Sequence, residues 1–478
     1  MRPQRARRTQ RRSDPTAVPP ERDSLSYRLL AGIARIAVRW YYRGVDFDGT
    51  DRIPRRGPVL MVVNHPNELM DAIFAGLVAP RQLTFTGKAT LFEHPIANAF
   101  LRHMRVVPLR RSQDEHATGA AVTLDASRNA DAFAAIHAAL ASEQMVLIFP
   151  EGRSWDEPRL APIKTGTARI ALSARDAGVR NLCIVPIGIN YERKEGLRSR
   201  VLVEVGQSVA LDALTPAQAQ VDHLTTEIAK RLHAVTLNFD GDIEADAVLD
   251  LATVLAATTG EIRPLGDPDA PLAAKIGVAR RADEIRQRLD RGELRPHIED
   301  RVRHVQRRLL ALRRTATKLG IRLDDVTLDT RLPAAGRFVV RELLLAAVGV
   351  PLAVWGRLNH LLPFTLATWL GERTSTARSQ LAMHTIVLGV ILIPVFYAAQ
   401  AAFVWRLAGP WWAAIYAMSL IPSASWDLRY TERLRQMRQR AMAWRYFRED
   451  PALQEKLRSE LFSLRDEAAS IASETPAM

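Results

Sequence analysis

The 478-residue sequence contains a single cysteine, Cys183, so the chain cannot form an internal disulfide bond. Cys183 lies in a short apolar run, residues 182–185, and we expect it to be a buried core residue. Without a disulfide framework, nothing in the chain indicates an oxidising compartment, and a cytoplasmic placement of the folded part fits best.

The sequence also lacks the signatures of several protein classes. It has no Gly-x-Ser-x-Gly nucleophile motif and no metal-ligand cluster with a recognisable spacing. Zinc-finger, helix-turn-helix and aromatic RNA-binding motifs are equally missing. We therefore expect no serine nucleophile, no metal, no cofactor and no nucleic-acid partner.

Positive charge predominates in this chain. Lys and Arg number 66 against 52 Asp and Glu, which gives a formal net charge of +14. Composition alone would allow either a nucleic acid or an anionic lipid surface as the partner of such an excess. Hydrophobic residues make up 47% of the chain, which is too apolar for general disorder, and its length predicts two or more folded units.

The chain begins with a basic segment followed by an amphipathic one. Residues 1–23 hold seven arginines and almost no large apolar residue, which predicts a disordered tail. Within residues 24–44, helical periodicity places Arg28, Arg35 and Arg39 on one face. The opposite face carries Leu29, Ile33, Ile36, Ala37, Trp40 and Tyr41. We expect this helix to lie at an anionic membrane surface, with docking on the protein's own core as the alternative.

Residues 45–214 alternate short apolar runs with helical ones, which predicts an α/β domain with a mainly parallel sheet flanked by helices. The expected strands are 59–63, 83–86, 106–109, 145–149, 182–190 and 201–205. The expected helices lie near 67–79, 94–103, 127–142 and 164–177. Residues 215–335 have few strand signals and no chemical motif, so we expect a helical region there.

The last third of the chain is apolar. Residues 386–405 are 20 uncharged residues in a row, long enough to cross a hydrocarbon core, whereas 407–422 and 343–356 are shorter runs. We expect a membrane hairpin within 336–425, followed by a cytoplasmic helical tail, 426–478. Arginines flank the hairpin on both sides, so the positive-inside rule places both flanks in the cytoplasm at the cell membrane; a buried soluble hairpin is the alternative.

A histidine and an aspartate follow the first expected strand. His65 comes directly after it, Pro66 and Asn67 suit the start of a helix, and Asp71 lies one and a half turns further on. An imidazole held by a carboxylate can take a proton from a hydroxyl nucleophile. An ordinary surface helix start would show the same spacing.

Cations follow two other expected strands, at the edge where open α/β sheets place their sites. Lys88 comes after one strand, and Arg110 and Arg111 come after another. Both positions suit phosphate binding, and arginine adds a bidentate fork. Taken singly, each is better explained as a solvated loop charge.

A carboxylate and a glycine follow the strand 145–149, in the run Glu151-Gly152-Arg153-Ser154. Glycine allows the backbone to approach a ligand closely, and a carboxylate can accept hydrogen bonds from hydroxyl groups. A plain strand-end turn is the alternative interpretation.

Together these segments resemble the four sequence blocks of the PlsC-like glycerolipid acyltransferase family in order and separation. The blocks are Asn64-His65-Pro66-Asn67 with Asp71, Pro108-Leu109-Arg110-Arg111, Phe149-Pro150-Glu151-Gly152-Arg153-Ser154, and Val185-Pro186-Ile187. That family includes glycerol-3-phosphate and 1-acylglycerol-3-phosphate acyltransferases. The resemblance covers residues 55–210.

The resemblance implies a role for each matching residue. His65 would be the general base and Asp71 its orienting partner. Arg111, or Arg110 in its place, would hold the phosphate of the acceptor. The remaining expected substrate-binding residues are Lys88, Glu151, Gly152, Arg153 and Ser154.

Two positions depart from the usual blocks of the family. Five residues separate His65 from Asp71 where four are common, and Arg105 stands where a glycine is usual. The longer spacing, together with the stretch 356–363, resembles a branch related to eukaryotic glycerol-3-phosphate and dihydroxyacetone-phosphate acyltransferases. The departures leave the identity of the acceptor open.

The resemblance implies transfer of a fatty acyl group from acyl-CoA or acyl carrier protein (acyl-ACP) to a hydroxyl of glycerol 3-phosphate or 1-acylglycerol 3-phosphate, in phospholipid biosynthesis. Another lysophospholipid or dihydroxyacetone phosphate is an alternative acceptor. A non-catalytic membrane-binding adaptor with the same fold is a further alternative, against which the intact His65 and Asp71 argue.

Overall fold

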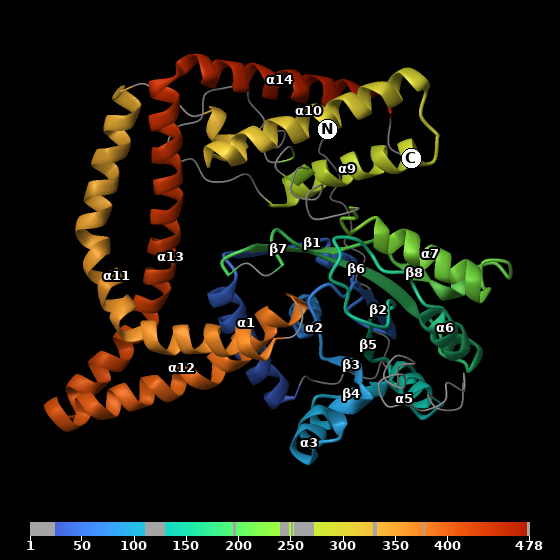
Figure 1. Ribbon diagram of the computed structural model, residues 1–478. Coiled ribbons are helices and arrows are strands. Elements are labelled where there is room, and N and C mark those ends of the chain that lie inside the picture. Colours follow the sequence, from blue (N-terminus) through green and yellow to red (C-terminus); the bar gives the residue numbers. More distant parts are fainter. Residues whose placement is uncertain are drawn as a thin grey trace, which may run out of the picture.

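The computed structural model describes residues 24–109, 130–194, 197–239, 248–249, 252, 272–327, 332–375 and 378–475. Arg110, Arg111 and the basic segment 1–23 lie outside these residues. Figure 1 shows a sheet covered by helices, built by the first half of the chain, beside a set of long helices built by the second half.

An eight-stranded sheet lies at the centre of the first half, in the order β1-β7-β6-β2-β5-β3-β4 with β8 paired to β6. The strands are β1 (Gly44–Asp48), β2 (Val59–Val63), β3 (Leu83–Lys88), β4 (Val106–Leu109), β5 (Met145–Ile148), β6 (Cys183–Tyr191), β7 (Arg200–Val205) and β8 (Val209–Ala210). Neighbouring strands are parallel except where β6 meets β7 and β8. The mainly parallel α/β sheet expected from the sequence is confirmed.

Strand β2 shows why helices cover both faces of the sheet. Successive side chains of a strand point to opposite faces, so Val59, Met61 and Val63 pack on one side while Leu60 and Val62 pack on the other. The covering helices are α1 (Leu25–Tyr41) and α2 (Leu69–Val78) on the first side, and α5 (Ala130–Ala141), α6 (Gly166–Asp176) and α7 (Val221–His233) on the second. Burial on both faces is typical of a central parallel strand.

Three local features differ from the sequence expectations. Strand β1 was not expected, because Gly44–Asp48 alternates only two apolar residues with aspartates and its pairing with β7 is not visible locally. Helix α1 ends at Tyr41, before that strand begins. Cys183 is half-buried at the first residue of β6 rather than buried.

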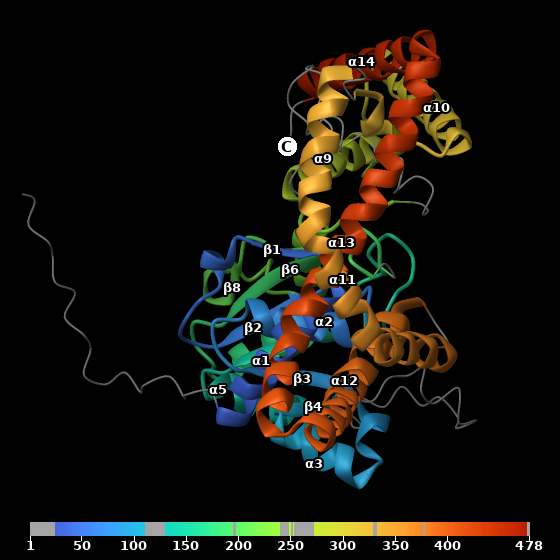
Figure 2. The same cartoon turned by 90° about the vertical axis from the view of Figure 1, so that its left-hand side faces the viewer.

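The second half of the described chain is built from long helices. They are α9 (Leu272–Asp290), α10 (Pro296–Leu319), α11 (Leu332–Thr374), α12 (Arg378–Ala408), α13 (Pro410–Glu449) and α14 (Pro451–Glu474). Helices α10, α13 and α14 share one hydrophobic cluster, and Figure 2 shows this helical end far from α3 (Pro95–His103) and β4. The apolar run 343–356 therefore lies inside α11, a helix of 43 residues. Most of the run 407–422 lies in the first turns of α13, a helix of 40 residues, while residues 407–408 end α12.

The stretch 356–363 marks a close crossing of α11 and α13. A Cβ atom on Gly356 would collide with the carbonyl oxygen of Ser423, so only glycine lets the two backbones approach. Beside it, the Arg357 guanidinium donates to Oδ1 of Asp427 at 3.0 Å. The stretch is thus the part of α11 that packs against α13.

Within the described residues, α12 contains the one segment long and apolar enough to cross a membrane, Gln380–Ala408. It includes the uncharged run 386–405. Its beginning is different, since Ala382 and Ile386 are buried in the same cluster as the α2 side chains. Helix α12 therefore starts against the α/β domain and continues beyond it.

Helix α1 is docked on one side and exposed on another. Tyr27, Val38 and Tyr41 are buried, which agrees with docking on the protein's own core. The apolar side chains that remain exposed, here called the α1 stripe, are Leu25, Leu29, Ile33 and Ile36. They lie within one quarter of the helix circumference.

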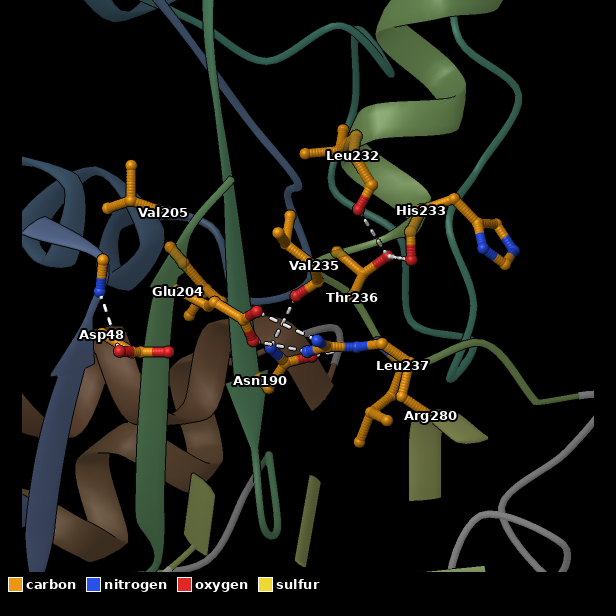
Figure 3. Close-up of polar contacts among 12 residues, drawn as sticks. Asp48, Asn190, Glu204, Val205, Leu232, His233, Val235, Thr236, Leu237 and Arg280 are labelled. Atoms are coloured by element: carbon orange, nitrogen blue, oxygen red, sulfur yellow. Dashed lines mark hydrogen bonds and ion pairs between the residues drawn. The ribbon is translucent and has the colours of Figure 1, made fainter. Parts of the chain in front are cut away.

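The segment after α7 ties the helical region to the sheet (Figure 3). Asn190 at the end of β6 donates from Nδ2 to the Val235 carbonyl oxygen at 2.9 Å and accepts the Leu237 N–H at 3.0 Å. Arg280 of α9 forms a bidentate ion pair with Glu204 of β7. These contacts fix the position of α9 on the sheet.

A substitution at Gly188 tests how closely the segment after α7 packs on β6. A Cβ atom there would collide with the Val235 carbonyl, so Gly188→Ala should lower the free energy of unfolding by about 1–3 kcal/mol. Gly277→Ala on α9 is the matched control, because its Cβ would meet nothing within 4 Å and alanine favours the helix. Thermal unfolding midpoints in detergent would measure both, and equal midpoints for the two variants would contradict the packing described.

Candidate active site

The expected site residues follow parallel strands that end at one edge of the sheet. Strands β2, β5, β3 and β4 are successive parallel neighbours, so their carboxyl ends lie in a row. His65 follows β2, Glu151 follows β5 and Lys88 ends β3. Arg110 and Arg111 would continue from β4 but lie outside the described residues.

His65 and Asp71 form the pair expected from the sequence. Nδ1 of His65 lies 2.9 Å from Oδ2 of Asp71, on the first turn of α2. Oδ2 also accepts the backbone N–H of Asn67 at 2.6 Å, and Oδ1 accepts the hydroxyl of Tyr191 at 2.7 Å. Asp71 is fully buried, so these three bonds replace the water that the carboxylate has lost.

The pair defines which nitrogen of His65 can do chemistry. With Nδ1–H donated to Asp71, Nε2 carries the free lone pair, and it has no hydrogen-bond partner among the described residues. The Phe149 ring stacks on the imidazole with centroids 3.8 Å apart and planes within 11°. The imidazole of His65 is therefore held on one face by the Phe149 ring and at Nδ1 by the Asp71 carboxylate.

Asn64 anchors the end of β2 that carries His65. Its Oδ1 accepts the Ile189 N–H at 2.7 Å, and its Nδ2 donates to the Ile189 carbonyl at 3.1 Å. The buried amide thus continues the pairing of β2 with β6 by one further residue. Sequence reasoning assigned no role to Asn64, although its place before His65 was noted.

The segment between His65 and Asp71 contains an unusual backbone conformation at Glu68. Glu68 has a φ of 42°, a region that non-glycine residues rarely adopt, at a cost of about 1–3 kcal/mol. Arg105 has a φ of 57°, which explains why a glycine suits that position. The two departures from the usual family blocks, the longer His65–Asp71 segment and Arg105, therefore each contain a residue with a positive φ.

Glu151 lies behind His65 in a site that favours its neutral form. Its Oε2 accepts the backbone N–H of His65 at 3.3 Å, and its side chain is buried. Burial, followed by the nearby charge of Asp71, raises the pKa of Glu151 to about 8, against the opposing effect of the His65 and Ala161 N–H groups. At neutral pH the protein therefore holds a protonated carboxyl group close to His65.

The turn after Glu151 is lined by cations. Gly152 has a φ of 70°, and a Cβ atom there would lie 2.9 Å from Nζ of Lys164. The Arg153 guanidinium lies over the Trp155 ring at 4.2 Å from its centroid. Lys164 was not expected from the sequence. The sequence feature that could have revealed it is its position just before Thr165 and Gly166, where α6 begins.

Polar atoms without partners surround the pair. Among the described residues, the buried Oγ of Ser154, Nε1 of Trp155 and Oδ1 of Asn67 have no hydrogen-bond partner. The backbone N–H of Trp155 donates to the His65 carbonyl oxygen at 3.0 Å, which holds this turn against His65. Buried polar groups are nearly always paired, so each of these three atoms has the capacity for one further hydrogen bond.

The structure thus brings together His65, Asp71, Glu151, Gly152, Arg153 and Ser154. Lys88 lies at the same edge but is separated from β2 by β5. Within the described ranges, no three His, Cys, Asp or Glu side chains converge closely enough to hold a metal ion. The groups assembled around His65 can move a proton and bind an anion.

This combination of a parallel α/β sheet and a carboxylate-held histidine defines an acid–base site at a sheet edge. Residues 44–190 match the family model described as Acyltransferase. The matched segment runs from β1 into β6 and includes His65, Asp71 and Glu151. Residues 44–190 are therefore a domain of the acyltransferase family.

Two relatives come from Saccharomyces cerevisiae. The chain is 25% identical to glycerol-3-phosphate O-acyltransferase 2 over 296 residues, which covers 59% of this chain and 39% of that protein. It is 36% identical to glycerol-3-phosphate O-acyltransferase 1 over 107 residues, covering 20% and 14% respectively. This chain thus spans well under half the length of either relative.

A solved structure also resembles the chain loosely. The 1-acyl-sn-glycerophosphate (LPA) acyltransferase PlsC from Thermotoga maritima is 17% identical, and the match covers 44% of this chain and 78% of that one, with a TM-score of 0.33.

The raised pKa of Glu151 predicts a pH dependence of stability. Between the ordinary glutamate pKa and about 8, the folded state keeps a proton that the unfolded state releases, so stability falls by about 1.4 kcal/mol per pH unit. The Glu151→Gln variant has no such proton, so it lacks this loss of stability. The unfolding midpoint of the variant should therefore rise relative to that of the parent as the pH increases from 5 to 8. Glu157→Gln, at an exposed site nearby, should show a constant difference. A constant difference for Glu151→Gln as well would show that Glu151 is already ionised in the folded protein.

Proposed function

We propose that this chain transfers a fatty acyl group from a thioester donor, acyl-CoA or acyl-ACP, to a hydroxyl of glycerol 3-phosphate or 1-acylglycerol 3-phosphate. The observation that carries the proposal is the His65–Asp71 bond of 2.9 Å, which leaves Nε2 free beside the Glu151 turn. The acyltransferase-family domain and the two yeast relatives, both named glycerol-3-phosphate O-acyltransferases, support it.

In the proposed reaction, His65 Nε2 takes the proton of the acceptor hydroxyl while that oxygen attacks the thioester carbonyl. Asp71 stabilises the imidazolium that forms. The tetrahedral intermediate then breaks its C–S bond, and the proton on His65 passes to the departing thiolate. The acceptor leaves as an ester and the carrier leaves as a free thiol, so His65 is regenerated without an acyl-enzyme or a resident cofactor.

The charges around the Glu151 turn favour a phosphate-bearing acceptor. Lys164 and Arg153 provide positive charge beside Gly152, and the unpaired Ser154 and Trp155 groups can donate hydrogen bonds. A neutral Glu151 does not repel a phosphate, as an ionised one would. Lys88, Arg110 and Arg111 are expected to add to this set from the neighbouring strands.

We further propose that the chain is bound to a membrane with its catalytic domain on the cytoplasmic side. Segment Gln380–Ala408 is long enough to cross the hydrocarbon core, and the α1 stripe leaves apolar side chains exposed beside the arginines of α1. The arginines on both sides of the expected hairpin favour a cytoplasmic position of its flanks by the positive-inside rule. A membrane-bound enzyme would reach lipid-soluble acyl acceptors and products directly.

The function is tested by supplying membranes that contain the protein with labelled acyl-CoA or acyl-ACP. Glycerol 3-phosphate, dihydroxyacetone phosphate, 1-acylglycerol 3-phosphate and a neutral lysolipid would be compared as acceptors. We expect transfer to a phosphate-bearing acceptor, and His65→Ala should lower the rate at least about a hundredfold. His304→Ala on the exposed face of α10 is the matched control. Transfer to no acceptor, or an equally active His65→Ala variant, would leave a binding module as the better account.

Lys164 provides a separate test of acceptor binding. Lys164→Gln removes a cation beside Gly152 without touching the base, so the KM for the phosphate-bearing acceptor should rise about tenfold while kcat changes little. Lys230→Gln, at an exposed position of α7, serves as the control and should leave the KM unchanged. An unchanged KM in Lys164→Gln would mean that the phosphate binds elsewhere.

A further inference from the structure

Glu68, which lies between His65 and Asp71 in the sequence, makes a contact with the apolar helix α12. Nε2 of Gln380, in the first turn of α12, donates to Oε1 of Glu68 at 3.1 Å. The bond therefore joins the loop that carries the base to the start of the helix that is long enough to cross a membrane.

The backbone of Glu68 depends on its surroundings. Its φ of 42° and ψ of −123° lie outside the regions that side-chain-bearing residues favour, and such a conformation persists only where neighbouring structure holds it. Glu68 is the N-cap residue of α2, but its side chain makes no capping hydrogen bond. Its carboxylate is turned to Gln380 instead of to the helix that it begins.

Helix α12 packs on α2 through its first turns, and beyond them it packs on α11 and α13 while part of its surface is exposed. Ala382 and Ile386 are buried in one cluster with Met70 and Phe74 of α2. Several of the apolar side chains that follow on α12 are exposed, including Val387, Ile391 and Val395. A shift of this helix relative to α2 would therefore act directly on Glu68.

We propose that Glu68 is a positioning residue through which the seating of α12 on α2 fixes the backbone between His65 and Asp71. This inference rests on the proposed function of the site. Glu68 lies on a different loop from Glu151 and Lys164, which face the proposed acceptor site. Loss of the contact should therefore lower kcat, by misaligning the base, and leave the KM for the acceptor nearly unchanged.

The experiment reverses the polarity of the contact. Gln380→Glu places two carboxylates against each other, and we expect kcat to fall about tenfold while the KM for the acceptor stays within about twofold. The double variant Glu68→Gln with Gln380→Glu restores one donor and one acceptor, and should recover kcat to within about threefold of the parent. Rescue by the swapped pair would not follow if Gln380 were merely a structural residue of α12.

Gln436→Glu provides a matched control. Gln436 donates to Oε1 of Glu432 on α13 at 3.1 Å, so this variant creates a comparable like-charge contact away from the site and should retain the parental kcat. If Gln380→Glu does not fold, as judged by its thermal midpoint, Glu68→Ala removes the contact without repulsion and carries the same expectation for kcat.

The outcomes separate the two proposals. A parent protein without acyl transfer would overturn the proposed function itself. An active parent together with an unaffected Gln380→Glu variant, or with a swapped pair that stays as slow as the single variant, would overturn the role of Glu68 alone.

Discussion

The rest of this structure depends on one buried carboxylate. Asp71 is removed from water and accepts bonds from His65, the Asn67 N–H and the Tyr191 hydroxyl. Removal of any one donor would leave part of a buried charge unpaired, which costs several kcal/mol. Because the donors come from the β2 end, the α2 start and the β6 end, the bonds that hold His65 also hold these elements together.

The same carboxylate influences the chemistry around it. Burial and, after it, the nearby charge of Asp71 raise the pKa of Glu151 to about 8, so a neutral carboxyl group lies close to His65 at neutral pH. The neutral group keeps the space near Lys164 positive, which suits an anionic acceptor. A fully polar site with both carboxyl groups ionised would bind a phosphate less well.

The sequence predicted those features that local patterns encode. The apolar runs identified β2 through β7, and the positions of His65 and Asp71 after β2 predicted the pair that the structure brings together. Tyr191, which follows His65 by more than a hundred residues, reaches Asp71 only because β6 pairs beside β2, and no local periodicity reveals such a contact. The same holds for Asn64 and Ile189, for Lys164 beside Gly152, and for β1, whose polar residues are stabilised by pairing with β7.

The central claim is that Asp71 holds His65 in the tautomer that leaves Nε2 free. Asp71→Asn tests it most directly, because an amide keeps the shape but can present a donor to Nδ1 and so favour the wrong tautomer. In single-turnover acyl transfer with saturating acceptor, we expect a rate loss on the order of 10²–10⁴, with acceptor affinity unchanged. A loss smaller than about fivefold would contradict the account, since His65 would then act without its carboxylate.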